Sequence, residues 1–280
     1  FDVCDVGAVL NVTADHLGLK GVDTIEDLAA VKSVVVEAVR RRGHSVLNAD
    51  DPLTLRMRRH ATGRIALFSM RGGEDMTEDV RAHIDAGDLA AVFEPGADGG
   101  DLALYRHRQR LVLMAARDIP AALGGAAGFN IQNALAAALM TFAQGVPLDA
   151  IRLGLSGFVS SFEQNPGRLN VFDGHDFQVI LDYAHNPASL SALAQMLTQI
   201  RSQHRRVIGM VSIPGDRRDE DILAMGRIAA GVFDTLVFRE APDGRGRAAG
   251  EVNTLLTDGA LQAGAQSKDV HRIIDERAAD

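Results

Sequence analysis

Six residues between a predicted strand and a predicted helix are the most informative about the fold: Asp182-Tyr183-Ala184-His185-Asn186-Pro187. The run before them is predicted to be a short strand, and apolar residues recur at helical spacing in the run after them. Asn186 suits the cap of that helix, with Pro187 at its first position, where a missing N–H costs nothing. Because ligand sites of open α/β sheets form beyond the carboxyl ends of strands, Asp182 and His185 are predicted to face a crevice. The alternative is an ordinary turn with a solvated Asp and His, and this stretch alone does not decide between the two.

A second polar cluster follows a predicted strand near the start of the chain. The apolar run Val6–Leu10 precedes Asn11-Val12-Thr13-Ala14-Asp15-His16-Leu17-Gly18. Asp15 and His16 offer oxygen and nitrogen ligands that suit a divalent ion or its bound water. A lone Asp-His pair is more often a capped turn than a metal site. Two strand-end clusters in one chain, however, favour a ligand site over two incidental turns.

Strand and helix patterns alternate along the chain, which predicts a wound α/β sheet rather than a bundle or a sandwich. A small antiparallel extension is expected between Leu89 and Leu113, where short β segments are separated by turn signals. The other elements predicted in this part are strands at 6–10, 45–48 and 65–68 and helices at 25–42, 52–60, 130–144 and 148–155.

A domain boundary is predicted within Ser160–Gly167, a short polar stretch that ends in a turn dipeptide. It divides the chain into residues 1–163 and residues 164–280. The second part is predicted to be a smaller, Rossmann-like α/β domain. Its strands are expected at 170–173, 178–181, 207–211 and 235–238.

Composition narrows the class of protein. The hydrophobic share of 46% is that of a globular protein, and no apolar run is long enough to span a membrane. No signal peptide is recognisable, and the only cysteine, Cys4, fits a reducing cytoplasm. The chain opens without Met and almost directly with a core strand, so we interpret it as a fragment of a longer protein.

The charge balance argues against a nucleic-acid partner. Lys and Arg number 29 and Asp and Glu number 37, which gives a net charge of −8, and Trp is absent. Two short basic runs, Arg40–Arg42 and His204–Arg206, are predicted to lie at helix ends before strands. There their positive charge would complement the helix dipole.

The chain resembles the Mur ligase superfamily, and within it the branch that makes cyanophycin, a polymer of aspartate and arginine. The resemblance implies that residues 1–163 are the carboxyl-terminal part of the central, ATP-binding domain. Residues 164–280 would be most of the C-terminal domain. Besides the two motifs above, it rests on Leu47–Pro52, Gly128–Ala137, Pro166–Leu169, Gly215–Glu220 and Arg245–Arg247.

This resemblance implies an ATP-dependent ligase that phosphorylates a carboxylate and lets an amine displace the phosphate, with ATP and Mg²⁺ as cofactors. In the cyanophycin branch, arginine is added to side-chain carboxylates of a polyaspartate backbone, by a full-length enzyme expected to be a homo-oligomer. The phosphate-binding pattern Gly-x-x-x-x-Gly-Lys-[Ser/Thr] does not occur in this sequence. In the family that loop lies upstream, so the chain alone is expected to be inactive.

Three residues of the first part have roles implied by the resemblance. His16 matches a magnesium ligand, and Lys32 matches a lysine that many relatives carry as a carbamate, although an ordinary solvated lysine is equally compatible with the sequence. Asn133 matches the residue whose amide pairs with adenine, because an amide presents a donor and an acceptor together. Asn130, one helical turn earlier, is predicted to cap the helix.

In the second part, Arg168, Asp182 and His185 match residues that face the nucleotide. An arginine at a hinge could instead pair with an acid. Arg217 is expected to neutralise a phosphate or a substrate carboxylate, and the neighbouring Arg218 to pair at the surface. Two further arginines, Arg245 and Arg247, are candidates to line the amino-acid side of the site or to be solvated turn residues.

The sequence leaves two alternative functions open. One is another Mur-type enzyme, either a cell-wall precursor ligase or a folylpolyglutamate synthetase. The other is a non-catalytic nucleotide-binding remnant that lacks the phosphate loop by nature. The sequence that flanks the chain would distinguish them.

Overall fold

The computed structural model describes residues 2–15, 17–18, 21–240 and 243–274. By contacts between Cα atoms the chain forms two compact units. The first comprises Phe1–Thr13 and Val22–Leu181, and the second comprises Ala14–Gly21 and Asp182–Asp280. A short stretch near the start of the chain therefore belongs to the unit that is otherwise built from its carboxyl-terminal part. Each unit is described separately below.

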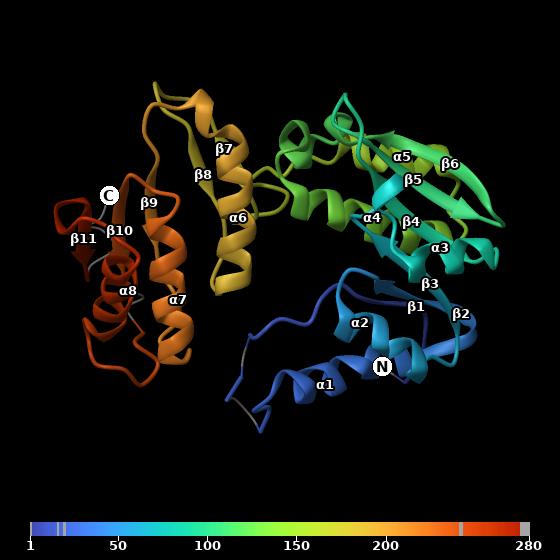
Figure 1. The fold of residues 1–280 in the computed structure, drawn as a ribbon, viewed down its shortest axis with the longest axis horizontal. Coiled ribbons are helices and arrows are strands. Elements are labelled where there is room, and N and C mark those ends of the chain that lie inside the picture. The colour runs from blue at the N-terminus through green and yellow to red at the C-terminus, as the bar shows by residue number, and fades with distance from the viewer. Residues whose placement is uncertain (1, 16, 19–20, 241–242, 275–280) are drawn as a thin grey trace. The chain divides into compact units, whose positions relative to one another are not determined.

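A six-stranded sheet forms the centre of the first unit, with its strands in sequence order (Figure 1). The first four strands pair in parallel, and the last two add an antiparallel hairpin, which confirms the predicted wound sheet with a small β extension. The strands are β1 (Cys4–Val9), β2 (Val39–Asn48), β3 (Arg64–Ser69), β4 (Leu89–Glu94), β5 (Asp101–Arg106) and β6 (Gln109–Ala115).

Helices cover both faces of this sheet, so neighbouring residues of one strand are buried on opposite sides. Phe68 packs into a cluster with Leu135 of α4, whereas Leu67 belongs to a cluster with Val80 of α3. This explains why the strands are apolar on successive residues instead of alternating with polar ones. The helices are α1 (Ile25–Glu37), α2 (Pro52–Arg56), α3 (Glu78–Asp85), α4 (Gly128–Ala143) and α5 (Leu148–Gly157).

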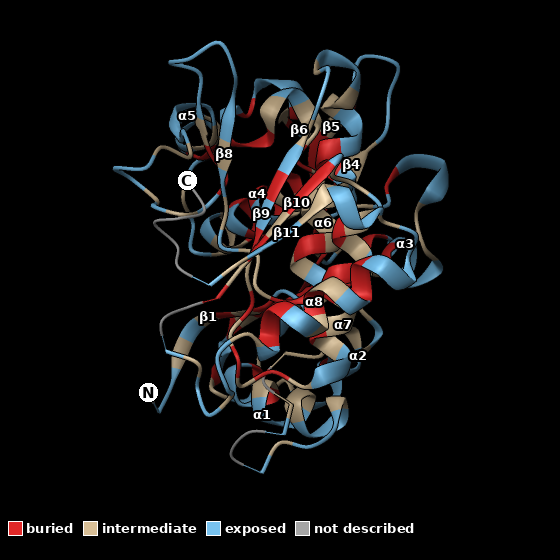
Figure 2. Ribbon diagram, turned by 90° about the vertical axis from the view of Figure 1, so that its left-hand side faces the viewer, coloured by how far each residue is buried: buried red, intermediate tan, exposed pale blue. Residues whose placement is uncertain are grey.

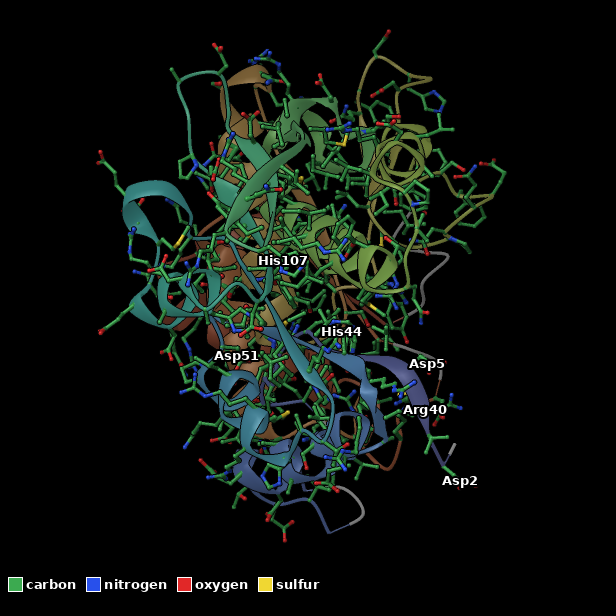
Figure 3. The ribbon with its side chains drawn as sticks, turned by 90° about the vertical axis from the view of Figure 1, so that its right-hand side faces the viewer. Asp2, Asp5, Arg40, His44, Asp51 and His107 are labelled. Carbon is green, nitrogen blue, oxygen red and sulfur yellow. The ribbon has the colours of Figure 1, made fainter. Side chains whose placement is uncertain are left out.

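One predicted boundary is wrong: the first helix ends at Glu37, and Arg40–Arg42 belong to β2. The chain enters the sheet directly after the helix, because Val39 pairs with Cys4 of β1. The N–H of Cys4 donates to the carbonyl group of Ala38 at 2.8 Å. Arg40 then binds Asp5 of the neighbouring strand, with Nη1 and Oδ1 3.1 Å apart (Figure 3). This basic run therefore does not complement a helix dipole.

The second unit contains a three-stranded parallel sheet in the order β11-β10-β9 and three helices that bury its core. Figure 2 shows buried residues along the sides of α7 and α8. The strands are β9 (Ile208–Val211), β10 (Thr235–Arg239) and β11 (Val270–Ile273), and the helices are α6 (Pro187–Ile200), α7 (Asp219–Ala230) and α8 (Glu251–Gln262).

Two short strands form a third, two-stranded sheet. The strands β7 (Asn170–Phe172) and β8 (Val179–Leu181) lie where strands were predicted, but among the described strands they pair with each other alone, antiparallel. The predicted division of the chain at residues 163 and 164 stays a prediction. In the described part of the chain, no helix combines the length and the apolar character needed to cross a bilayer.

Candidate active site

In the first unit, three side chains fix the backbone of Leu10–Val12, directly after β1. The amide of Asn48 donates to the carbonyl group of Leu10 at 2.8 Å, and the ammonium group of Lys32 donates to the carbonyl group of Asn11 at 2.9 Å. The carboxylate of Asp51 accepts a hydrogen bond from the N–H of Val12 at 2.6 Å. Lys32 therefore holds the loop of the Asn-Val-Thr motif, and its amine is engaged with a backbone carbonyl group.

The two acids that follow β2 are held by backbone amides. Asp51 accepts hydrogen bonds from the N–H groups at the start of α2, and is its N-cap. Asp50 accepts from the hydroxyl of Ser69 at 2.7 Å and from the N–H of Met70 at 2.6 Å, just past β3. The segment after β2 thus ties together the ends of three parallel strands. No role was predicted for these two acids, although two acids and a proline after a strand are a recognisable helix start.

Two asparagines lie at the start of α4, and one of them departs from its predicted role. Asn130 does not cap the helix, because α4 begins at Gly128 and the Asn130 amide donates to the carbonyl group of Ala121 at 2.6 Å. Asn133 is exposed, and its Nδ2 donates to Oδ1 of Asn130 at 3.2 Å. The predicted shared face of these two residues is therefore present, and Asn133 presents its amide to solvent.

In the second unit, the Asp182–Pro187 motif forms the predicted helix start. Asn186 caps α6 because its side chain accepts a hydrogen bond from the N–H of Ser189 at 2.8 Å. The Ser189 hydroxyl in turn accepts one from the backbone N–H of Asn186. Nδ1 of His185 lies 2.9 Å from the carbonyl oxygen of Tyr183. This contact fixes the imidazole and leaves Nε2 to face other groups.

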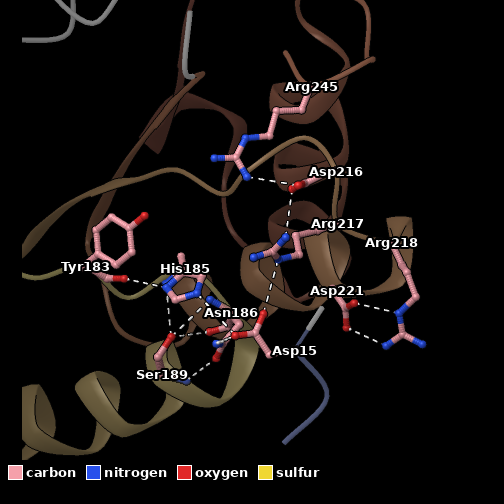
Figure 4. A network of polar contacts seen from close by, with 10 residues as sticks. All are labelled: Asp15, Tyr183, His185, Asn186, Ser189, Asp216, Arg217, Arg218, Asp221 and Arg245. Carbon is pink, nitrogen blue, oxygen red and sulfur yellow. Dashed lines mark hydrogen bonds and ion pairs between the residues drawn. The ribbon is translucent and has the colours of Figure 1, made fainter. Parts of the chain in front are cut away.

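Those other groups include the carboxylate of Asp15, from the short stretch that joins the second unit (Figure 4). Its Oδ2 lies 3.4 Å from Nε2 of His185 and accepts from the amide of Asn186 at 3.2 Å. Its Oδ1 lies 3.5 Å from Nε of Arg217. An acid from the Asp15-His16 motif, the histidine of the Asp182–Pro187 motif and an arginine past β9 therefore meet at one place.

Arg217 lies between two acids. Its side chain is only 6% exposed, and Nη1 donates to Oδ1 of Asp216 at 2.9 Å. Arg245 binds the other oxygen of Asp216 at 3.1 Å, so positive and negative groups alternate from Arg245 through Asp216 and Arg217 to Asp15 (Figure 4). A buried guanidinium is tolerated because acids on two sides balance its charge.

The remaining predicted site residues are dispersed among the described elements. Arg218 pairs with Glu220 and Asp221, as expected of a surface residue, and a hydrogen bond to Asp221 raises its pKa above the ordinary value. Arg168 is exposed before β7, and Asp182 is half-buried after β8. His16 lies outside the described residues.

Side chains that could bind a metal ion are not clustered among the described residues. Among them, no three His, Cys, Asp or Glu side chains are grouped as metal ligands. Asp50 and Asp51 are already engaged with backbone N–H groups, and the predicted ligand His16 is not among these residues.

Comparison with known proteins connects these features to a family. Residues 3–141 match the family "Mur ligase middle domain", and residues 167–279 match "Mur ligase, glutamate ligase domain". Cyanophycin synthetase of Crocosphaera subtropica is 43% identical over 279 residues, which is 100% of this chain and 31% of that relative. The enzyme of the same name from Synechocystis is 43% identical over 94% of the chain and 29% of its own length. The chain thus spans about a third of these relatives.

Solved structures show the same fold. MurF from Acinetobacter baumannii superposes with a TM-score of 0.65 at 22% identity, covering 98% of this chain and 51% of that one. Folylpolyglutamate synthase from Mycobacterium tuberculosis, complexed with ADP, gives 0.64 at 21%, with 98% and 55% covered. The resemblance seen in the sequence is confirmed: the chain belongs to the Mur ligase family, contains parts of its middle and C-terminal domains, and has cyanophycin synthetases as relatives along its whole length.

Proposed function

We propose that the chain is part of a ligase of the cyanophycin synthetase type. In the proposed reaction, a side-chain carboxylate of a polyaspartate backbone takes the γ-phosphoryl group of ATP, and ADP leaves. The amine of arginine attacks this acyl phosphate, forms the amide and releases phosphate. The supporting observation is 43% identity along 100% of the chain to a cyanophycin synthetase. The identity to a diaminopimelate-adding cell-wall ligase from Gloeobacter violaceus is lower, 35% over 80% of this chain.

Four residues predicted from the sequence have proposed roles at the nucleotide. Asn133 suits adenine because its exposed amide offers a donor and an acceptor to the base. Arg168, Asp182 and His185 are proposed to contact the ribose and the phosphates. The resemblance supports these assignments.

Arg217 is proposed to stabilise negative charge on the acyl phosphate. Fixed positive charge in a site shielded from water lowers the energy of such an anion. The guanidinium is buried, and its bond to Asp216 is short, whereas Asp15 lies 3.5 Å from Nε. We therefore expect an incoming phosphate or carboxylate to take the place of Asp15 beside Arg217.

Magnesium would supply charge neutralisation between the phosphates, and His16 is its proposed ligand. The carbamate proposed for Lys32 would convert a cation into an anion and would leave a single N–H on the nitrogen that now donates to the carbonyl of Asn11. Mass spectrometry of the native protein at neutral pH tests this directly, because a carbamate adds the mass of carbon dioxide. The proposed location is the cytoplasm, and the proposed partners are arginine, the aspartate-based polymer and further copies of the full-length chain.

The test is an assay of ADP release by the full-length protein with a β-aspartyl-arginine primer. Turnover should require both the primer and arginine, and lysine and diaminopimelate serve as competing amines. Turnover with diaminopimelate but not with arginine would contradict the substrate assignment and favour the cell-wall reaction. An absence of ATP turnover with any amine would favour a non-catalytic protein.

The chain by itself is proposed to be inactive, because its sequence contains no Gly-x-x-x-x-Gly-Lys-[Ser/Thr] pattern to hold the phosphates. Calorimetry should therefore detect only weak ATP binding to residues 1–280. A micromolar dissociation constant would contradict this proposal.

A further inference from the structure

The loop between β9 and α7, which contains Arg217, is held by a side chain from the loop between β10 and α8. Nε of Arg247 donates to the carbonyl group of Gly215 at 2.6 Å, and Nη2 donates to the carbonyl group of Arg217 at 2.7 Å. The same guanidinium binds Asp219 at 2.6 Å and also Glu251, the first residues of α7 and α8. One side chain therefore joins two loops and two helix starts.

The two loops also meet backbone to backbone. A Cβ atom placed on Gly215 would lie 2.3 Å from the carbonyl oxygen of Gly244, so no larger residue fits there without separating the loops. Arg247 is only 16% exposed in its side chain and lies against this contact. Arg247 was a candidate to line the amino-acid side of the site or to be a solvated turn residue, but in the structure its guanidinium binds groups of the protein.

We propose that Arg247 is a positioning residue for Arg217. The bond between Arg217 and Asp216 joins neighbours within one loop and therefore cannot fix the direction of that loop. The bonds from Arg247 come from outside the loop and bind the carbonyl groups on either side of Asp216. They keep the guanidinium of Arg217 buried and directed at Asp15. The consequence for catalysis rests on the role proposed for Arg217 above, whereas the ordering of the loop does not.

The geometry requires a guanidinium. Arg247 contacts two carbonyl oxygens and two carboxylates, and a planar group with five spread N–H donors can reach all four. A lysine has one nitrogen at the end of a flexible stem, and so cannot span both carbonyl groups while pairing with Asp219 and Glu251. A role that needed only positive charge would be satisfied by either residue.

Hydrogen exchange of the chain tests the ordering. In Arg247→Gln and in Arg247→Lys, peptides that cover residues 213–218 should exchange faster by about tenfold. Peptides from β9 and β10 should keep the rates of the wild-type chain. The matched control is Arg227→Gln, which removes a single exposed hydrogen bond to Gln262, 3.0 Å long, between α7 and α8. This control should leave residues 213–218 protected.

Three results would overturn the proposal: wild-type protection in Arg247→Gln, full protection in Arg247→Lys, or faster exchange throughout the second unit. The full-length enzyme then tests the consequence for catalysis. In Arg247→Lys we expect kcat to fall by about ten- to a hundredfold, with the KM for ATP changed by less than about twofold. A loop that has lost protection while kcat is unchanged would contradict the positioning role. A wild-type enzyme that does not use arginine would instead contradict the proposed function and leave the exchange result standing.

Discussion

The carboxylate of Asp51 accepts a hydrogen bond from the backbone N–H of Val12, 39 residues earlier in the chain, with 2.6 Å between Oδ2 and N. Its other oxygen accepts the N–H groups of Leu53 and Thr54 at 2.9 and 3.0 Å. One side chain therefore starts a helix and holds the loop after β1. In Figure 3 the Asp51 side chain is labelled among those of the first unit.

Replacing Asp51 by alanine should lower the free energy of unfolding by about 2–3 kcal/mol, because a helix cap is lost and a backbone N–H is left without its acceptor. Asp51→Asn keeps one acceptor oxygen and should cost about half as much. Urea unfolding measures both. Asp149→Ala is the control, since the Asp149 side chain is 91% exposed. Equal losses in the control and in Asp51→Ala would contradict the role of Asp51.

The two tyrosines of the chain, with no tryptophan present, make a second measurement simple. Burial, together with a hydrogen bond to Glu94 and its negative charge, raises the pKa of Tyr105 to about 12. A Tyr183→Phe variant leaves Tyr105 as the only phenol, and its near-ultraviolet absorbance should titrate with a midpoint about two units above the ordinary value near 10. A midpoint at that ordinary value would contradict the 2.6 Å hydrogen bond to Glu94.

The same pKa determines how stability depends on alkaline pH. The folded chain holds the Tyr105 proton more tightly than the unfolded chain, so the stabilisation is complete below the unfolded pKa, near 10. It is lost as the pH rises from there through about 12. Glu94→Gln should bring the Tyr105 pKa part of the way down, because burial remains while the charge is removed.

Arg217→Met should destabilise the chain by about 3 kcal/mol, because Asp15 and Asp216 would lose the cation between them. Arg217→Lys keeps the charge, and should cost less. Thermal unfolding of the chain compares the two variants. The exposed Arg205 provides the control, and Arg205→Met should change stability by less than about 0.5 kcal/mol. An Arg217→Met chain as stable as the control would contradict a stabilising role of Arg217 between these acids.

Two glycines should respond in opposite directions to the same substitution. A Cβ on Gly226 would lie 2.1 Å from the carbonyl oxygen of Leu256, where α7 and α8 touch, whereas nothing lies within 4 Å of a Cβ on Gly154 in α5. Gly226→Ala should therefore cost about 2 kcal/mol or more. Gly154→Ala should instead stabilise the chain by about 0.5–1 kcal/mol, as expected for a helix interior. Chemical unfolding that gave the same sign for both would contradict the helix packing.

Much of the fold could be predicted because its signals are local. The Asn186-Pro187 helix start is present as expected, and so is the helical segment from Pro52 to His60, with its last turn tighter. The end of α1 could not be predicted, because Val39 continues the helical stripe of Val31 and Val35 and suits a strand equally well. Helix α3 was missed: only Val80 and Ile84 are buried in it, too few for a clear period.

The candidate site was less predictable because its contacts join distant parts of the chain. The motifs of Asp15 and His185 were each identified, yet nothing in their sequences showed that they meet. Arg217 was expected at a phosphate, but not as a buried partner of two acids. Asn130 was expected to cap its own helix, whereas its amide binds a carbonyl group nine residues earlier.

The stretch Ala14–Gly21 belongs to the second unit, although the chain on both sides of it belongs to the first. Asp15 and Asn186 are 171 residues apart, so on the ribosome the acid emerges long before the residues it will bind exist. The second unit is thus completed by a stretch that is synthesised before the rest of that unit. If the chain were cut before Asp182, the released fragment would keep Asp216 but lack Asp15, the other acid beside Arg217, and a synthetic peptide carrying residues 11–22 would be the natural means of restoring it.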